Sequence, residues 1–359
     1  MTHPALDPRG DLVALTRAIC DVPSVSGDER ALADLVEDAL RSAAHLEVLR
    51  DGDAVVARTH LGRAQRVVVA GHLDTVPVAD NLPTRVVGDE LWGRGTVDMK
   101  GGVAVALALA VALDAPTRDV TWVFYDHEEV AADLNGLGRL VRNHPDWLAC
   151  DFAVLGEPSN GGLEGGCNGT LRAEVRLAGV AAHSARAWAG VNAVHAAGEV
   201  LRRLEAYEPR SVDVDGLVYR ESLNAVLISG GTATNVIPDG CVVTVNYRFA
   251  PSSSVADAQA HVRELFDGYD VVVTDAAPGA RPGLDAPAAQ EFAAAVLAVT
   301  GGAPAPKYGW TDVARFSELG VPAVNFGPGD PMLAHKDDER CPLAQLRTSY
   351  EALRVWLTS

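Results

Sequence analysis

The sequence is short of positive charge and has no apolar run long enough to span a membrane. Its 359 residues hold 30 Lys and Arg against 48 Asp and Glu, which gives a formal net charge of -18. Nucleic acids and anionic membrane surfaces are bound through clustered Lys and Arg, so this balance argues against both as partners. The longest apolar run, 103–113, is shorter than the stretch of about 20 residues that crosses a bilayer.

The sequence also lacks paired cysteines. It has no C-x-x-C motif, and its five cysteines are scattered: Cys20, Cys150, Cys167, Cys241 and Cys341. An odd, dispersed set in a chain of this length predicts reduced thiols rather than a disulfide framework. The N-terminus shows no basic start followed by an apolar core, so we expect no secretory signal and a cytoplasmic location.

Strand-like and helix-like segments alternate in the first half of the chain and again near its end. A hydrophobic content of 48% is enough for a sizeable core. Short, apolar, β-branched runs predict buried strands at 66–70, 120–125, 152–155 and 321–326. Helical patterns lie between them, and the one at 101–113 is apolar all round, as a core helix is. This α/β order predicts a mostly parallel sheet with helices on both faces.

The pattern changes after about residue 168. The segments then read as strand 170–177, helix 191–206, strands 223–229 and 240–249, helix 254–266 and strand 269–274. This β-α-β-β-α-β order predicts an inserted two-layer α+β domain of ferredoxin-like type. We therefore expect a catalytic domain formed by 1–169 and 283–359, interrupted by a second domain at 170–282.

The start of one helix shows a recognisable capping pattern. Ser26 is followed three residues later by Glu29, just before a segment with helical spacing of apolar residues. In a capping box these two side chains satisfy each other's backbone N–H groups. We therefore predict an amphipathic helix over 27–42 that begins with this box.

Histidines and carboxylates follow the predicted strands where the strands end. His72 and Asp74 come at the end of the strand predicted at 66–70, Glu128 and Glu129 follow the one at 120–125, and Glu157 follows the one at 152–155. Asp98 lies in a glycine-rich turn, and His335 lies in a late loop. The carboxyl ends of parallel strands meet at one edge of a sheet, where ligands bind. Histidines and carboxylates without thiolates suit catalytic zinc, cobalt or manganese, and a shared carboxylate could bridge two ions.

Five ordered motifs make the chain similar to a known superfamily. They are GHLDTVP (71–77), GRGTVDMKGG (93–102), HEE (127–129), GEPS (156–159) and AH (334–335). With these motifs, the chain resembles the co-catalytic di-zinc amidohydrolases of the aminoacylase, carboxypeptidase and succinyl-diaminopimelate desuccinylase superfamily. The resemblance extends over nearly the whole chain.

The resemblance implies a role for each motif residue. Two zinc ions are implied, with cobalt or manganese as possible substitutes: His72 and Glu157 on one, Glu129 and His335 on the other, and Asp98 bridging both. Asp74 would accept a hydrogen bond from His72 and fix its tautomer. Glu128 would be the general acid/base that takes a proton from the bridging water and returns it to the leaving amine. A cis peptide is implied after Asp98.

The inserted domain resembles the dimerisation or lid domain of the superfamily, which implies a homodimer formed through 170–282. His183 matches the histidine that dimers of the superfamily supply across the interface to stabilise the tetrahedral oxyanion. His195 is the alternative candidate, and its helical context favours packing. We assign no catalytic role to the remaining candidates, His127, His144 and His261.

The substrate is expected to be a small N-acyl amino acid. Arg248 offers a forked donor for a carboxylate, and Asn235 and Thr311 could donate hydrogen bonds to the substrate. Trp310 departs from the glycine-rich Thr-Asp turn that desuccinylases of the superfamily carry at this place, and we interpret Cys167 as a small buried residue. The segments around Cys167 and His183 resemble actinobacterial desuccinylases, which implies hydrolysis of N-succinyl-L,L-2,6-diaminopimelate to succinate and L,L-diaminopimelate in lysine and peptidoglycan biosynthesis.

Two other functions stay open from the sequence. One is an N-acetylornithine deacetylase, a general N-acyl-amino-acid amidohydrolase or a carboxypeptidase of the same superfamily. The other is a catalytically inactive relative that binds metal or peptide. Glu128 argues against the inactive relative, because a binding protein has no need of a free carboxylate beside the metal ligands.

Overall fold

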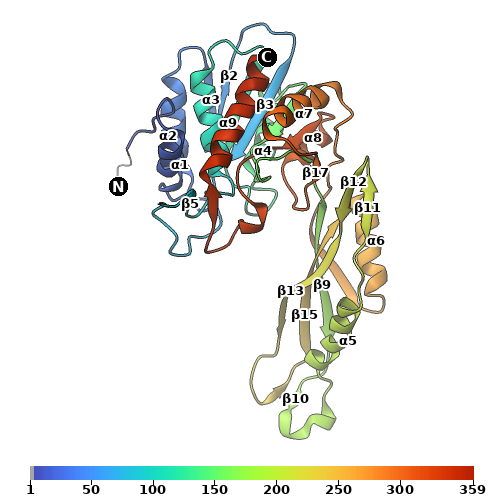
Figure 1. Ribbon diagram of the computed structural model, residues 1–359. Coiled ribbons are helices and arrows are strands. Elements are labelled where there is room, and N and C mark those ends of the chain that lie inside the picture. The colour runs from blue at the N-terminus through green and yellow to red at the C-terminus, as the bar shows by residue number, and fades with distance from the viewer. Residues whose placement is uncertain (1–3) are drawn as a thin grey trace. The chain divides into compact units, whose positions relative to one another are not determined.

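The structure, a computed structural model, describes residues 4–359, and its chain divides into two units (Figure 1). The first unit contains the chain up to Gly165, 283–305 and 315–359, and the second unit contains 166–282 and 306–314. The second domain predicted from the sequence, 170–282, did not include the short segment 306–314. This segment groups with the second unit because Asn168 N donates to Lys307 O at 3.2 Å and Trp310 Nε1 donates to Pro278 O at 3.1 Å.

The first unit is built on a sheet with the strand order β1-β2-β6-β3-β7-β18-β8-β17. Its four central strands run parallel: β6 (Asp119–Tyr125), β3 (Arg66–His72), β7 (Phe152–Leu155) and β18 (Ala323–Asn325). The outer strands are β1 (Glu47–Asp51), β2 (Ala54–Arg58), β8 (Glu164–Gly165) and β17 (Ala305–Pro306). The predicted mostly parallel α/β sheet is confirmed.

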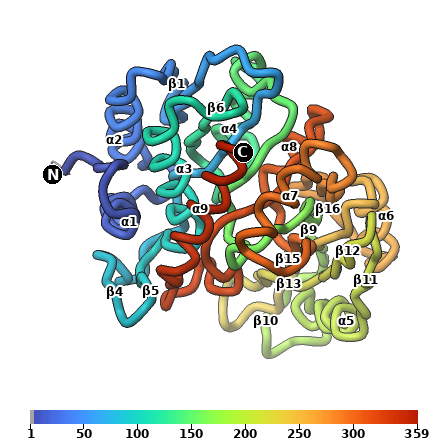
Figure 2. Tube along the Cα trace, turned by 45° about the horizontal axis from the view of Figure 1, so that its top comes forward, coloured from blue at the N-terminus to red at the C-terminus, as the bar shows by residue number. Residues whose placement is uncertain are grey.

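Helices cover both faces of this sheet, since every residue of β6 is buried and successive side chains of a strand point to opposite faces. The helices of this unit are α1 (Leu12–Cys20), α2 (Arg30–Arg41), α3 (Lys100–Ala112), α4 (Gly136–Asn143), α7 (Pro287–Thr300) and α9 (Leu343–Thr358), and α8 (Val313–Glu318) begins in the second unit and continues into the first. Figure 2 shows α1, α3 and α9 side by side, with α3 buried between its neighbours as its apolar sequence predicts. Among helices of the described chain, none combines the length and apolar character needed to span a membrane.

A small sheet in the first unit brings two distant loops together. Its strands are β4 (Arg85–Val87), β5 (Glu90–Trp92) and β19 (Arg340–Pro342), in the order β19-β5-β4. Because β19 pairs with β5, the loop before β19 lies beside the turn that follows β5. His335 is in the first of these loops and Asp98 is in the second.

The second unit has the predicted β-α-β-β-α-β order. Its elements are β9 (Gly169–Ala178), α5 (Ala193–Glu205), β13 (Ser222–Gly230), β15 (Gly240–Phe249), α6 (Val255–Leu265) and β16 (Asp270–Ala277). The sheet is antiparallel with the order β13-β15-β9-β16, which is the ferredoxin-like arrangement. A hairpin of β11 (Ser211–Val214) and β12 (Leu217–Arg220) and a short pair of β10 (Ala182–His183) and β14 (Val236–Ile237) complete the unit.

The predicted capping box at the start of α2 does not form. The helix begins at Arg30, and no side chain caps it. Glu29 instead accepts hydrogen bonds from Gly27 N, and Ser26 Oγ donates to Asp74 Oδ2 at 2.7 Å. The tertiary contact of Ser26 with Asp74 has displaced the local contact that the spacing predicted.

Candidate metal centre

The first unit brings all five predicted metal ligands into one cluster. His72 is the last residue of β3, Glu129 and Glu157 follow β6 and β7, and Asp98 and His335 come from the two loops joined by the small sheet. Three groups of three have ligand atoms within 4.8 Å of one another: His72, Asp98 and Glu157; Asp98, Glu129 and His335; and His72, Glu128 and Glu129. The carboxyl edge of a parallel sheet is where such groups converge.

Asp98 lies at the centre of the cluster, and each of its carboxylate oxygens faces a different histidine. Oδ1 is 3.2 Å from His72 Nε2, and Oδ2 is 3.3 Å from His335 Nε2. Burial alone would raise the pKa of Asp98, but its hydrogen bonds to His335 and His72 lower that pKa well below the usual range. The carboxylate is therefore ionised and positioned for two cations. The peptide bond from Asp98 to Met99 is cis, as the resemblance implied.

The donor set fits a pair of divalent metal ions. Two of the groups share only Asp98, so one carboxylate can serve two neighbouring sites while His72 and Glu157 complete the first and Glu129 and His335 the second. The hydrogen bonds that His335 donates to the carboxylates of Asp98 and Glu129 raise the pKa of His335 to about 10, in keeping with a cluster that favours positive charge beside these carboxylates. Imidazole and carboxylate donors without thiolates are typical of catalytic zinc and related ions.

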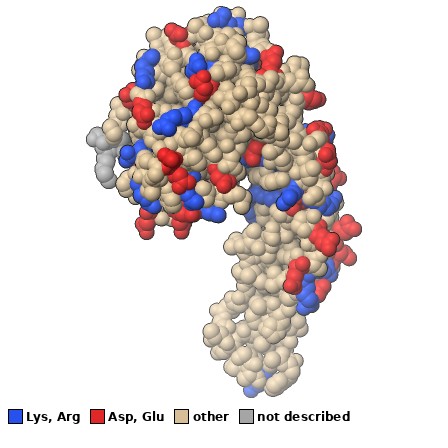
Figure 3. Space-filling view, in the orientation of Figure 1, with Lys and Arg blue, Asp and Glu red and all other residues tan. Residues whose placement is uncertain are grey.

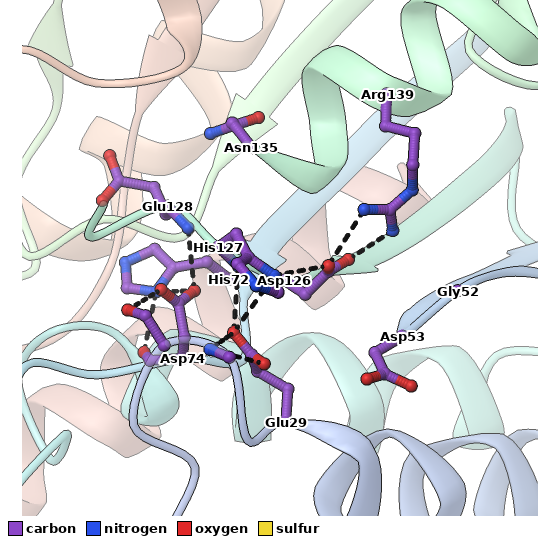
Figure 4. Close-up of polar contacts among 12 residues, drawn as sticks. Glu29, Gly52, Asp53, His72, Asp74, Asp126, His127, Glu128, Asn135 and Arg139 are labelled. Carbon is purple, nitrogen blue, oxygen red and sulfur yellow. Dashed lines mark hydrogen bonds and ion pairs between the residues drawn. The ribbon is translucent and has the colours of Figure 1, made fainter. Parts of the chain in front are cut away.

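Glu128 lies beside this cluster, and its backbone is held from below by Asp74 (Figure 4). Glu128 N and Glu129 N each donate to the Asp74 carboxylate at 3.0 Å, and the Glu128 carboxylate points away from it. Burial raises the pKa of Asp74, yet contacts with His72 and these two N–H groups outweigh burial and lower it to about 2. Asp74 is thus an ionised support for the loop that carries both glutamates.

The contact between Asp74 and His72 differs in detail from the predicted one. His72 Nδ1 lies 3.0 Å from the backbone oxygen of Asp74 and 3.5 Å from Oδ1 of its side chain. A carbonyl oxygen fixes the tautomer of a metal-binding histidine as a carboxylate does, because Nδ1 carries the proton and Nε2 is left for the ion. His72 Nε2 is the atom that faces Asp98.

A buried ion pair that sequence reasoning missed joins three loops of the cluster. Glu339 Oε2 accepts from Arg94 Nη1 at 2.9 Å, and Glu339 Oε1 accepts from Val97 N at 2.9 Å and Asp98 N at 3.2 Å. Arg94 also donates to the carbonyl oxygens of Pro77 and Lys336. The Arg94–Glu339 pair therefore ties the loops that follow His72 and His335 to the backbone of Asp98. Arg94 stands in a quoted motif, but no local pattern pairs it with Glu339.

Glu339→Ala is expected to weaken binding of the ions by about 10–100-fold, the usual cost of removing an outer partner of metal ligands. The change leaves Arg94 and two backbone N–H groups without their buried acceptor, so the Asp98 loop loses its support. Bound zinc is measured after equilibration with a competing chelator. Glu318→Ala, at an exposed position, is the control. Unchanged zinc affinity in a folded Glu339→Ala protein would show that the pair does not hold Asp98.

The remaining predicted site residues lie in the second unit. His183 is exposed on β10, its Nδ1 accepts from Ala185 N at 3.1 Å, and it pairs with Val236 on β14. Asn235 lies beside it, because Ser184 N donates to Asn235 O at 2.9 Å. Arg248 is half-buried near the end of β15. Thr311 is buried, and its carbonyl accepts from Cys167 Sγ at 3.6 Å, so Cys167 is the buried residue that the sequence indicated.

The chain matches a family of peptidases and several named relatives. Residues 68–359 match the model of peptidase family M20/M25/M40. A Mycobacterium tuberculosis protein is 55% identical over 98% of this chain and 99% of its own; its name, succinyl-diaminopimelate desuccinylase, is given as provisional. The succinyl-diaminopimelate desuccinylase of Corynebacterium glutamicum is 46% identical over 99% of this chain and 98% of its own.

Solved structures of low sequence identity have the same fold. An M20 family metallo-carboxypeptidase from Sulfolobus solfataricus superimposes with a TM-score of 0.79 at 14% identity, over 97% of this chain and 98% of that one. A Bacillus subtilis protein described as a dinuclear metal binding peptidase from the M20 family gives a TM-score of 0.70 at 18% identity, over 96% of each chain. At these identities, the likeness concerns the fold alone.

Proposed function

The chain belongs to peptidase family M20/M25/M40, and we propose that within this family it hydrolyses N-succinyl-L,L-2,6-diaminopimelate to succinate and L,L-diaminopimelate. The observation that supports this most directly is the identity of 46% to the Corynebacterium desuccinylase over nearly the full length of both chains. The reaction is a metal-dependent cleavage of a linear amide. Its product serves lysine and peptidoglycan biosynthesis.

The chain would hold two zinc ions, for which cobalt or manganese could substitute. His72 and Glu157 belong to the first ion, Glu129 and His335 to the second, and Asp98 to both, in agreement with two of the groups in the structure. When bound, the ions supply Lewis acids that polarise the amide carbonyl and lower the pKa of water.

Glu128 would move the protons. Its carboxyl group lies near ligand atoms of His72 and Glu129 but stands outside the two groups that share Asp98. From there it accepts a proton as water attacks the amide carbon and donates a proton to the departing amine. Asp74 fixes its direction by binding the N–H groups of Glu128 and Glu129.

The proposed substrate-binding residues of the second unit cannot all reach one small molecule from a single chain. Asn235 lies in the loop beyond the pairing of Gly230 with Cys241, whereas Arg248 is next to the last residue of β15. A strand rises about 3.3 Å per residue, so the 10 residues of β15 separate its two ends by roughly 30 Å. We therefore assign Arg248 and Thr311 to the substrate site of one protomer, and Asn235 with His183 to that of its partner.

Exposed apolar side chains on the second unit support the proposed homodimer. Strand β13 is an edge of its sheet, and Leu227 and Ile228 on it are 69% and 54% exposed. Trp188, in the short 3-10 helix Ser184–Ala189 that follows β10, is 83% exposed. Figure 3 shows few charged side chains around this end of the unit on the face in view. An open strand edge with an apolar, uncharged surface is typical of an interface.

Two inactive variants are expected to restore activity when their subunits exchange. A Glu128→Gln subunit lacks the proton carrier of its own site. A His183→Ala subunit lacks the group that it would supply to its partner's site to stabilise the oxyanion. A mixed dimer then contains one site with both groups intact, so the mixture should regain up to about a quarter of wild-type turnover. Each variant mixed with itself is the control. No recovery, in a mixture shown by mass spectrometry to contain mixed dimers, would contradict action across the interface.

The function is tested by comparing hydrolysis of two substrates by zinc-loaded protein. We expect kcat/KM for N-succinyl-L,L-diaminopimelate to exceed that for N-acetyl-L-ornithine by about 100-fold or more. An acetyl group has no carboxylate, so the polar groups that would bind the succinyl carboxylate are left unpaired. Preference for the acetyl substrate would indicate the deacetylase alternative. No hydrolysis of either, nor of other N-acyl amino acids, with zinc bound would indicate the inactive relative.

We also propose a cytoplasmic location. The five cysteines are all free in the structure, and four of them are buried. Burial raises the pKa of the thiols, to about 12 for Cys20 and about 11 for Cys167, so they stay protonated and unreactive. Free thiols of this kind suit a reducing compartment. Cell fractionation of the native organism tests this location.

A further inference from the structure

We propose that His127, to which the sequence assigned no role, is a positioning residue that sets the direction of Glu128. Its ring nitrogen Nδ1 faces two buried carboxylates, and its backbone makes the turn that presents the next two residues to the metal centre (Figure 4). The inference rests on the proposed hydrolase activity and concerns the geometry of its proton carrier.

The first of the two carboxylates, Asp126, is itself firmly held. It follows the last residue of β6 and is 2% exposed. Arg139 of α4 donates to Oδ1 at 2.6 Å and to Oδ2 at 3.0 Å, a forked pair of charge-assisted hydrogen bonds. His127 Nδ1 lies 2.7 Å from Oδ2 of the same carboxylate. The ring is therefore fixed to a group that cannot easily turn away.

The second carboxylate belongs to Glu29, which lies just before α2. Its side chain is completely buried, and Oε1 lies 3.1 Å from His127 N and 3.5 Å from His127 Nδ1. Both of its oxygens also accept from Gly27 N at 2.9 Å. Glu29 is the residue that the sequence predicted in a capping box, and in the structure its carboxylate makes these contacts instead. Its contact with a residue almost 100 positions later explains why Glu29 is buried rather than exposed at a helix start.

The backbone of His127 is left-handed, with a φ of 59°, a conformation that non-glycine residues rarely adopt. This turn directs three successive N–H groups to two buried acceptors. His127 N donates to Glu29, while Glu128 N and Glu129 N donate to Asp74. The loop thus has no free backbone donor over these three residues, and the side chain of Glu128 leaves it in one fixed direction.

The geometry explains what a substitution should do. Alanine at this position keeps the backbone N–H that donates to Glu29, but it loses the side-chain contacts with both carboxylates and has an unfavourable left-handed backbone. Asparagine tolerates that backbone and keeps a short side-chain donor for Asp126. A displacement of about 1 Å in a catalytic group can lower turnover by about 100-fold. Substrate affinity depends on other residues and should change little.

The experiment compares His127→Ala, His127→Asn and the surface control His60→Ala, a histidine whose only described partner is Glu47. We expect kcat of His127→Ala to fall by about 10–100-fold with KM within about twofold and zinc content unchanged. The kcat of His127→Asn should be within about threefold of the wild-type value, and the kcat of His60→Ala should equal the wild-type value. Hydrogen exchange of the peptide 126–130 should be at least about tenfold faster in His127→Ala only.

Glu29→Ala supplies a second variant for the same network. Removing Glu29 frees the same turn, so we expect a similar loss in kcat, and the double variant with His127→Ala should be little worse than either single one. Wild-type activity on the succinyl substrate is measured first, because its absence would overturn the proposed function itself. With an active wild type, unchanged kcat in His127→Ala, or equal losses in the Ala and Asn variants, would overturn the positioning role.

Discussion

Glu128→Gln is expected to lower kcat by about 10²–10⁴-fold, the usual contribution of a positioned general acid/base. The amide has the shape of the carboxylate but neither accepts nor returns a proton. The N–H of residue 128 still donates to Asp74, so the loop should keep its conformation. Turnover of the succinyl substrate and zinc content are measured on the same preparation.

Glu129→Gln is the matched comparison, because it changes the neighbouring glutamate in the same way. Glu129 Oε1 lies 3.0 Å from His335 Nε2 and belongs to the group proposed to hold the second ion, so its variant should lose metal as well as activity. We expect Glu128→Gln to retain two ions and Glu129→Gln to retain fewer. Equal zinc loss in both variants, or near wild-type turnover in Glu128→Gln, would remove Glu128 from the role of proton carrier.

Asp98→Asn is expected to lower turnover by at least about 1,000-fold and to reduce bound zinc from two ions to one or none. Its two oxygens face His72 and His335 separately, at 3.2 Å and 3.3 Å, so a single substitution affects both sites. An amide has no charge and offers one good acceptor in place of two, and the loss of about 4 kcal/mol of transition-state stabilisation corresponds to this factor. Zinc is counted by elemental analysis and turnover by amide hydrolysis.

Asp338→Asn is the control for this variant. Asp338 lies near His335 in the chain, is exposed and pairs with Arg340, so its loss should leave both measurements unchanged. Retention of two tightly bound ions by Asp98→Asn would contradict the shared position of this carboxylate.

Much of the fold and the ligand set could be predicted because both have strong local signals. Strand β6 is recognisable as a buried strand from its apolar, β-branched sequence, and Glu129 lies in the turn that follows it. The parallel sheet then brings strand ends together by topology, which is why residues as distant as His72 and Glu157 could be placed in one cluster. The ferredoxin-like insertion could also be predicted, because its six main elements are recognisable one by one in the sequence and follow the β-α-β-β-α-β order of that fold.

The supports of the cluster could not be predicted, because they depend on long-range pairs without a local pattern. Nothing near Glu339 in the sequence indicates that its carboxylate binds the backbone of Asp98. Glu29 is the opposite case, because a local pattern predicted a capping box that does not form. Its carboxylate instead accepts a hydrogen bond from His127 N, a long-range contact that the pattern does not indicate. His127 itself is an ordinary histidine in sequence, and only its left-handed backbone marks it as unusual.

The division of the chain near its end could not be predicted either. The segment 306–314 joins the second unit through backbone contacts such as that of Asn168 with Lys307, which no residue type specifies. Thr311 therefore belongs to the second unit, although the sequence around it continues the pattern of the first. Proposed substrate-binding residues on such segments are the ones for which sequence spacing gives least guidance.

The most direct test of the proposed centre is the anomalous diffraction of zinc-loaded crystals at the zinc absorption edge. We expect two peaks in each protomer, one bonded to His72 and Glu157 and the other to Glu129 and His335, with Asp98 bonded to both at about 2.0–2.2 Å. Glu128 should contact neither ion. A single peak, two peaks without Asp98 between them, or Glu128 bonded as a ligand would contradict the proposed two-ion centre and its proton carrier.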